Sequence, residues 1–181
     1  MILEQIYQRN SNPNIFYEKE RELNCGSFAL NVTEWYVPYI EEAEVDDYES
    51  MMYTADERDF HISELFRDGY SREEVMLDIL DRDFEFILKT CPWLEPIEKD
   101  EINIDDRVIA YRLSMMCEDY PDDFDPDRDM DFHFRVLIDG EWWEKNGAGE
   151  VHYVTCKTDD EPWVVHEDLI YDGEIRYARF K

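Results

Sequence analysis

The fold is set by the segment DFHFRVLIDGEWWEKNGAG, residues 131–149. Its first part, Asp131–Ile138, alternates apolar side chains at positions 132, 134, 136 and 138 with a second set that includes His133 and Arg135, which predicts a β-strand. Asp139 and Gly140 tolerate the positive φ angles of a two-residue hairpin turn. A second strand is predicted over Glu141–Lys145, and residues 146–149 end it as a loop. Because successive side chains of a strand point to opposite faces, His133 is predicted to face away from Phe132 and Phe134.

Helices are predicted upstream of this hairpin. Asn24 is typical of a helix N-cap, and the helix that begins at Cys25 is predicted to run until Pro38. A short helix is predicted over Asp59–Asp68 and is stopped by Gly69. Ser71 and Glu74 form a capping-box motif before the clearest helix of the chain, which Pro92 ends. The predicted apolar face of that helix consists of Val75, Met76, Ile79, Leu80, Phe84, Ile87 and Leu88.

Further strands surround the hairpin in the sequence. They are predicted over Arg107–Met115, Glu150–Cys156, Trp163–His166 and Gly173–Phe180. Helices followed by antiparallel strands predict an α+β fold with helices packed on an antiparallel sheet. No repeat or linker divides the chain, so residues 1–181 are predicted to form a single domain.

Charge is the strongest compositional signal. The chain has 47 acidic and 18 basic residues, a net charge of −29 and a sequence pI near 4.2. Such a balance argues against direct binding to nucleic acid or to an anionic membrane, because both are polyanions. It favours either a strongly solvated surface or a basic protein partner. The hydrophobic fraction of 44% argues against disorder.

Other class signals are absent from the sequence. The first residues lack the pattern of a signal peptide, and no run approaches the ~20 apolar residues of a membrane span. The four cysteines form no CxxC pair, so we expect free thiols in a cytoplasmic protein, with no metal site and no cofactor. These cysteines are Cys25, Cys91, Cys117 and Cys156.

Acidic residues gather in segments. Residues 41–49 form one run, and Glu118–Asp131 holds eight carboxylates in fourteen residues without the spacing of a calcium loop. Carboxylates three or four residues apart on the helix after Ser71 recur every ~4.5–6 Å, and a solvated helix face is the simpler explanation of such a stripe. The alternative is imitation of a phosphate array, in which the partner-binding residues are Glu74, Asp78, Asp81, Glu85, Asp122, Asp123, Asp125 and Asp127.

A second hypothesis rests on Cys25 and His133. A cysteine in the first turn of a helix can have a lowered thiol pKa, and a histidine held on a strand can act as its base. The predicted reaction is acyl transfer, with Cys25 as nucleophile and His133 as proton shuttle. His152 is an alternative partner for Cys25. A buried structural cysteine is the competing interpretation.

A Cys that opens a helix, followed far downstream by a His on an antiparallel sheet, resembles the papain-like and NlpC/P60-like cysteine hydrolases. More narrowly, Asn24-Cys25, Asp131–Phe134 and Asp139-Gly140 with Trp142 and Lys145 resemble a group of small proteins common in phage genomes. The resemblance spans residues 24–149. It implies a papain-like core and a third polar catalytic residue after the His, for which Glu144 or Asn146 could stand.

By charge and size the chain also resembles DNA-mimic inhibitors, including anti-CRISPR proteins that occupy the nucleic-acid channel of guide-loaded Cas9. Our leading prediction is an acidic phage-type inhibitor of a basic, nucleic-acid-handling host protein. The alternatives are a Cys/His peptidase or amidase and an acidic interaction protein without catalysis. The inhibitor is preferred because a charge of −29 affects every encounter, whereas the dyad requires two residues to meet in space.

Overall fold

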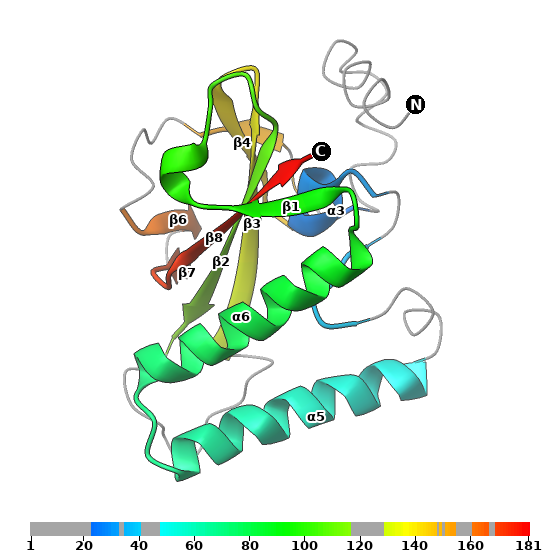
Figure 1. Ribbon diagram of the computed structural model, residues 1–181. Coiled ribbons are helices and arrows are strands. Elements are labelled where there is room, and N and C mark those ends of the chain that lie inside the picture. Colours follow the sequence, from blue (N-terminus) through cyan, green and yellow to red (C-terminus); the bar gives the residue numbers. More distant parts are fainter. Residues whose placement is uncertain are drawn as a thin grey trace.

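A computed structural model describes residues 23–32, 35–40, 48–116, 129–147, 149, 151–154, 161–166 and 169–181. In these ranges the chain forms three α-helices, a six-stranded antiparallel sheet of order β1-β8-β2-β3-β4-β5, and a two-stranded sheet, β6-β7 (Figure 1). The α+β prediction is confirmed. The helices are α3 (Cys25–Leu30), α5 (Tyr48–Arg67) and α6 (Arg72–Thr90), with a 3-10 turn η2 (Lys99–Glu101). The strands are β1 (Leu94–Ile97), β2 (Val108–Met115), β3 (Met130–Ile138), β4 (Glu141–Lys145), β5 (Val151–Tyr153), β6 (Trp163–His166), β7 (Leu169–Tyr171) and β8 (Ile175–Phe180).

The central hairpin forms as predicted. Asp139 and Gly140 have φ angles of 53° and 79°, so both turn residues lie in the left-handed region. The turn places Arg135 opposite Glu144 and Ile138 opposite Glu141. β2 pairs along the other edge of β3, and all eight of its residues are buried.

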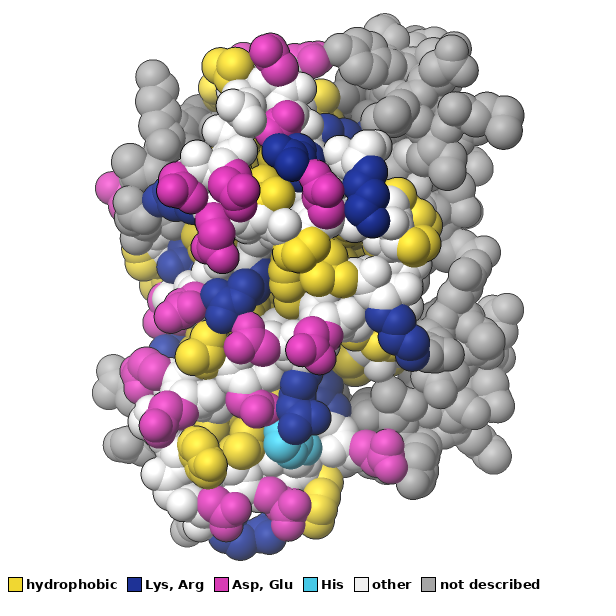
Figure 2. All heavy atoms as spheres, viewed as in Figure 1, with side chains coloured by type: hydrophobic (Ala, Val, Ile, Leu, Met, Phe, Trp, Pro, Cys, Tyr) yellow, Lys and Arg dark blue, Asp and Glu magenta, His cyan; other side chains and the backbone are white. Residues whose placement is uncertain are grey.

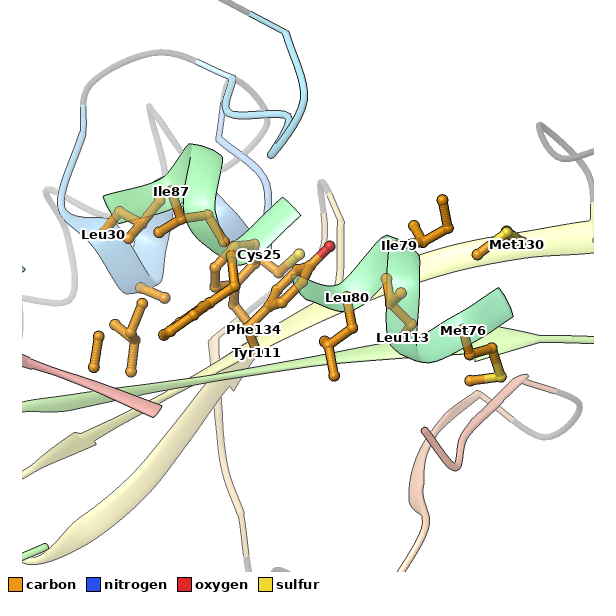
Figure 3. Close-up of a cluster of buried hydrophobic side chains, with 14 of the residues drawn as sticks. Cys25, Leu30, Met76, Ile79, Leu80, Ile87, Tyr111, Leu113, Met130 and Phe134 are labelled. Atoms are coloured by element: carbon orange, nitrogen blue, oxygen red, sulfur yellow. The ribbon is translucent and has the colours of Figure 1, made fainter. Parts of the chain in front are cut away.

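Each face of the sheet is covered by a different layer. α3 and α6 pack on one face, and α5 lies against α6 on the side away from the sheet (Figure 1). The core on this face includes Ile79, Leu80, Tyr111 and Phe134, and Cys25 lies among these side chains (Figure 3). The opposite face carries a smaller core, formed by Val108, Ala110, Leu137, Trp163, Tyr171 and Tyr177.

The best-predicted helix is α6. Ser71 and Glu74 form both hydrogen bonds of the capping box, and the helix ends before Pro92. Its predicted apolar face is buried, apart from Leu88, which is half-buried against the core. Phe132, one of the apolar positions of the predicted strand, is also only half-buried.

Two helix boundaries differ from the prediction. α3 ends at Leu30, far short of Pro38, because Asn31 adopts a left-handed conformation with φ 61°. α5 begins at Tyr48, well before the predicted start at Asp59, and its end before Gly69 is as expected. Strands β1 and β7 were not predicted.

Truncation of Ile79 should measure the packing of α6. Ile79 is 1% exposed, so Ile79→Ala should lower the free energy of unfolding by about 2–5 kcal/mol. Leu77→Ala is the matched control on the same helix, because Leu77 is 37% exposed and should cost only about 0.5 kcal/mol. Urea unfolding of both variants checks this, and equal losses would show that α6 does not bury the face assigned to it.

Candidate functional site: a buried His133–Glu144–Arg135 cluster

Cys25 begins α3 and is part of the core. The Asn24 carboxamide oxygen accepts hydrogen bonds from the Ser27 backbone N–H (2.9 Å) and the Ser27 hydroxyl (2.8 Å), so the predicted N-cap is confirmed. Cys25 is 5% exposed, and its thiol lies 4.0 Å from the carbonyl oxygen of Phe132. It packs in the same cluster as Phe134.

The environment of Cys25 disfavours the thiolate and so does not activate the thiol. Burial is the largest influence and raises the pKa of Cys25 to about 12, because the charged thiolate is disfavoured away from water. Nearby backbone N–H groups oppose this rise, and the negative charge of Asp131 adds to it. The predicted lowering of the thiol pKa is therefore wrong, and Cys25 is a protonated core residue at neutral pH.

His133 lies on the other face of β3. It is 2% exposed, and its ring packs 5.1 Å from the ring of Tyr171 and 6.2 Å from that of Trp163, measured between centroids. Both aromatic residues belong to the second core. The sheet thus separates Cys25 from His133, and the structure does not bring the predicted dyad together.

His133 is instead one member of a buried charged cluster. Its Nε2 lies 3.3 Å from Oε2 of Glu144, and Nε of Arg135 donates to the same oxygen at 2.7 Å. Burial favours the neutral form of Glu144, but the adjacent His133 ring and the charge and hydrogen bond of Arg135 prevail and lower its pKa. Glu144 is therefore held as a carboxylate.

Strands β6 and β7 close over this cluster. The Arg135 guanidinium lies 4.3 Å from the centre of the Trp163 ring, a cation–π contact. The Tyr171 hydroxyl donates to Asp131 at 2.7 Å, and the Asn146 side-chain amide donates to the Val165 carbonyl at 3.3 Å. Asn146 therefore ties β4 to β6. The cluster fixes the two-stranded sheet in place, and the side chains packed on His133 offer no activated nucleophile.

The other histidines have separate positions. His61 bonds to Asp78 between α5 and α6, at 2.7 Å. The backbone of His152 pairs with that of Glu144 across β4 and β5. Its side chain lies outside the described residues, as does that of His166.

Most carboxylates of the predicted acidic stripe of α6 form hydrogen bonds or ion pairs within the molecule. Glu74, Asp81 and Glu85 are exposed as predicted, and Asp78 is only partly exposed. Glu74 completes the capping box, and Asp78 accepts from His61 and from Arg82. Asp81 accepts from Arg176 at 2.9 Å. Four further predicted residues, Asp122, Asp123, Asp125 and Asp127, lie outside the described residues.

Sequence reasoning missed a second buried charge. Asp83 is 3% exposed and accepts hydrogen bonds from Arg58 (3.2 Å) and from the Tyr111 hydroxyl (2.7 Å). Burial raises the pKa of Asp83 and Arg58 opposes that rise. The sequence position of Asp83 could have indicated its burial, because it has the same helical spacing as Met76, Leu80 and Ile87 on the apolar face of α6.

Together these features define an acidic α+β protein with two buried ion pairs. No protein-family model matches the chain, and neither a curated protein nor a solved structure is detectably similar to it. In the part of the chain that the structure describes, no three His, Cys or carboxylate residues are grouped to hold a metal ion. Among those residues there is also no helix long and apolar enough to cross a bilayer.

Thiol labelling should distinguish a core cysteine from a nucleophile. With a pKa near 12, Cys25 should resist iodoacetamide in the folded protein at pH 8 and react only after denaturation. Mass spectrometry of the peptide that contains Cys25 gives the labelled fraction, and the same peptide labelled in denaturant is the control. Rapid labelling of folded Cys25 would contradict this placement.

Loss of the Glu144 charge should destabilise the second face. Glu144→Gln leaves the Arg135 guanidinium without a buried counter-charge, so the free energy of unfolding should fall by about 3–5 kcal/mol at pH 7. The folded-state pKa of Glu144 lies below its ordinary value of 4.5, so its stabilisation is complete above that pH and is lost as the pH falls. The stability difference between wild type and variant should therefore shrink below about pH 4.5.

A control for this substitution is Glu64→Gln on α5. Glu64 faces Arg67 at 3.8 Å with both side chains well exposed, so its removal should cost about 0–1 kcal/mol. Denaturant unfolding at pH 7 and pH 4 compares the two variants. A Glu144→Gln protein as stable as Glu64→Gln would show that the buried pair contributes little.

Proposed function

We propose that the protein is an acidic, non-catalytic inhibitor that binds a basic nucleic-acid-handling protein in the cytoplasm by imitating the charge of nucleic acid. Guide-loaded Cas9, with its basic channel, is the partner class that fits the phage-type resemblance. The burial of Cys25, and its separation from His133 by the sheet, leave binding as the better-supported activity.

The observation that carries this proposal is that most of the described arginine side chains already bind acceptors of the same chain. Seven of the nine described arginines donate a hydrogen bond to a carboxylate or a backbone carbonyl of the same chain, and Arg67 forms an exposed ion pair with Glu64 at 3.8 Å. Exposed carboxylates without an ion pair among the described residues remain on α5, α6, η2, β4 and the connecting segments. They are Glu57, Asp68, Glu73, Glu85, Glu98, Asp100, Glu101, Asp105 and Glu141.

The resulting field is broad. On the face shown in Figure 2, acidic side chains are spread over the described surface, with basic ones between them. A net charge of −29 attracts a basic channel over distances of about the Debye length, ~8–10 Å at moderate salt. It also repels nucleic acid itself. Such a surface raises the rate of encounter with a basic partner, and its effect weakens as salt rises.

Binding to purified guide-loaded Cas9 tests the proposal. Affinity measured by biolayer interferometry should fall by about tenfold or more between 0.1 and 0.5 M NaCl, because ionic screening weakens exposed charge pairs. Joint replacement of Asp122, Asp123, Asp125 and Asp127 by Asn should weaken binding at low salt. Replacement of the same four residues by Glu keeps the charge and is the matched control.

A catalytic protein predicts the opposite pattern. Cys25→Ala, checked for folding by its melting temperature, should inhibit the nuclease as wild type does. Inhibition that is lost in Cys25→Ala but kept in the Asn variant, or affinity that does not respond to salt, would overturn the proposed function.

A further inference from the structure

β1 pairs with only part of the length of β8 at one edge of the main sheet. β1 pairs with β8 from Leu94 opposite Phe180 to Ile97 opposite Tyr177, and there it stops. β2 continues along the other side of β8 as far as Ile175. Beyond Ile97 the chain leaves the sheet and forms η2. The first residues of β8 thus have a strand on one side only among the described residues.

The register fixes which backbone groups point to that open side. The Lys181 backbone N–H donates to the Trp93 carbonyl, whereas the Phe180 backbone N–H donates to Arg107 on the β2 side. Backbone groups of a strand alternate between its two neighbours, so residues 175, 177, 179 and 181 point toward β1. In this register the position opposite Ile175 is Lys99, which lies in η2 instead. The N–H and C=O of Ile175 therefore face a side that β1 has left.

A cleft of about 730 Å³ lies at this place. It is bounded by Phe84 of α6, residues 96–99, Glu101, Arg112 of β2 and residues 172–177. Pro96 and Ile97 form an apolar part of its wall. The volume is within the usual ~300–1,000 Å³ of ligand sites. An open strand edge inside a cleft is the geometry in which an extended peptide can add as a further strand.

The charges around the cleft select the kind of peptide. Its arginines are already bound, Arg112 to the carbonyls of Gly173 and Glu161, and Arg176 to Asp81 and Glu174. Glu98 and Glu101 are exposed, and the Glu101 carboxylate accepts a hydrogen bond from the Glu98 backbone N–H at 2.8 Å. Neither carboxylate forms an ion pair with a cation in the described part of the chain. Lys99 also lines the cleft, but Glu98, Asp100 and Glu101 give this segment three carboxylates against one ammonium, so the rim at η2 is net negative beside the open edge.

We propose that this cleft binds an extended, Lys/Arg-containing segment of a partner protein, which pairs with Ile175 as a continuation of β1 and places its cations against Glu98 and Glu101. The inference rests on the proposed function, because it takes the partner to be basic. It adds a defined docking position to a charge effect that is otherwise spread over the surface.

The test uses the full chain and a fluorescent, acetylated peptide of alternating Arg and Val, about seven residues long. Wild type should bind it, and N-methylation of alternate peptide amides should weaken binding by about tenfold, because charge is kept while edge hydrogen bonds are lost. Glu98→Gln/Glu101→Gln should weaken binding by a similar factor. The matched control, Glu57→Gln/Asp68→Asn, removes the same charge from exposed positions outside the cleft and should stay within about twofold.

Hydrogen exchange gives the position independently. The unmodified peptide should slow amide exchange over residues 172–177. Equal binding of the N-methylated peptide, equal losses in the two double variants, or unchanged exchange would each overturn the cleft assignment. Salt-dependent binding of the basic nuclease by wild type, together with any of these results, would leave the proposed function standing. Failure to bind the nuclease would instead remove the proposed function.

Dimerisation through the same edge is a competing use. If the cleft received a strand from a second copy, light scattering would show a dimer that the peptide dissociates. That outcome would overturn the assignment of a basic partner segment to the cleft.

Discussion

β2 and β3 are buried on both faces, so each face of the sheet requires its own cover from another part of the chain. The helices supply an apolar cover on the side of Phe134, where Ile79 and Leu80 pack. The opposite side carries His133 and Arg135, and the burial of the Arg135 charge is possible because Glu144 supplies a counter-charge. Trp163 and Tyr171 then exclude water from these groups. β8, which follows β6 and β7 in the sequence, lies between β1 and β2 in the main sheet.

This two-sided burial also decides the fate of the predicted dyad. The strand period of two puts His133 on the face opposite to Phe134, and α3 docks Cys25 on the Phe134 side. The sequence contained part of this answer, because a two-residue turn at 139–140 fixes the hairpin register. Arg135 then lies opposite Glu144, and His133 is the diagonal neighbour of Glu144 on the same face. The ion-pair cluster could have been predicted from the turn alone.

The caps and the turn that are specified by short-range hydrogen bonds were predicted correctly from the sequence. The Asn24 cap, the Ser71–Glu74 capping box and the Asp139-Gly140 turn each satisfy nearby backbone groups, and all three form as expected. The end of α3 depends on contacts with residues that follow the helix. Asn24 donates to the Tyr36 carbonyl at 2.6 Å and Ser27 accepts from the Tyr36 backbone N–H at 3.1 Å, which folds the chain back after Asn31.

Elements that rely on distant partners were missed for the same reason. β1 lies in an acidic segment with Pro96 and becomes a strand through its pairing with β8, more than seventy residues later. Pro96 is tolerated because the register turns its backbone away from β8, as befits an edge strand. Asp83 was not singled out in the sequence, although its place in the apolar period of α6 is consistent with its burial.

The surface is negative because the chain has few basic residues and because some of them pair with buried carboxylates. Eighteen basic residues serve 47 acidic ones, and buried carboxylates such as Asp83 and Glu144 each hold an arginine that could otherwise have neutralised the exterior. The field therefore belongs to the whole surface and discriminates poorly between one basic protein and another. Discrimination requires a place where charge coincides with shape and with directional hydrogen-bonding groups. In the described part of the chain the edge of β8 at Ile175 has all three, because β1 leaves the sheet there and η2 brings Glu98 and Glu101 beside the opening.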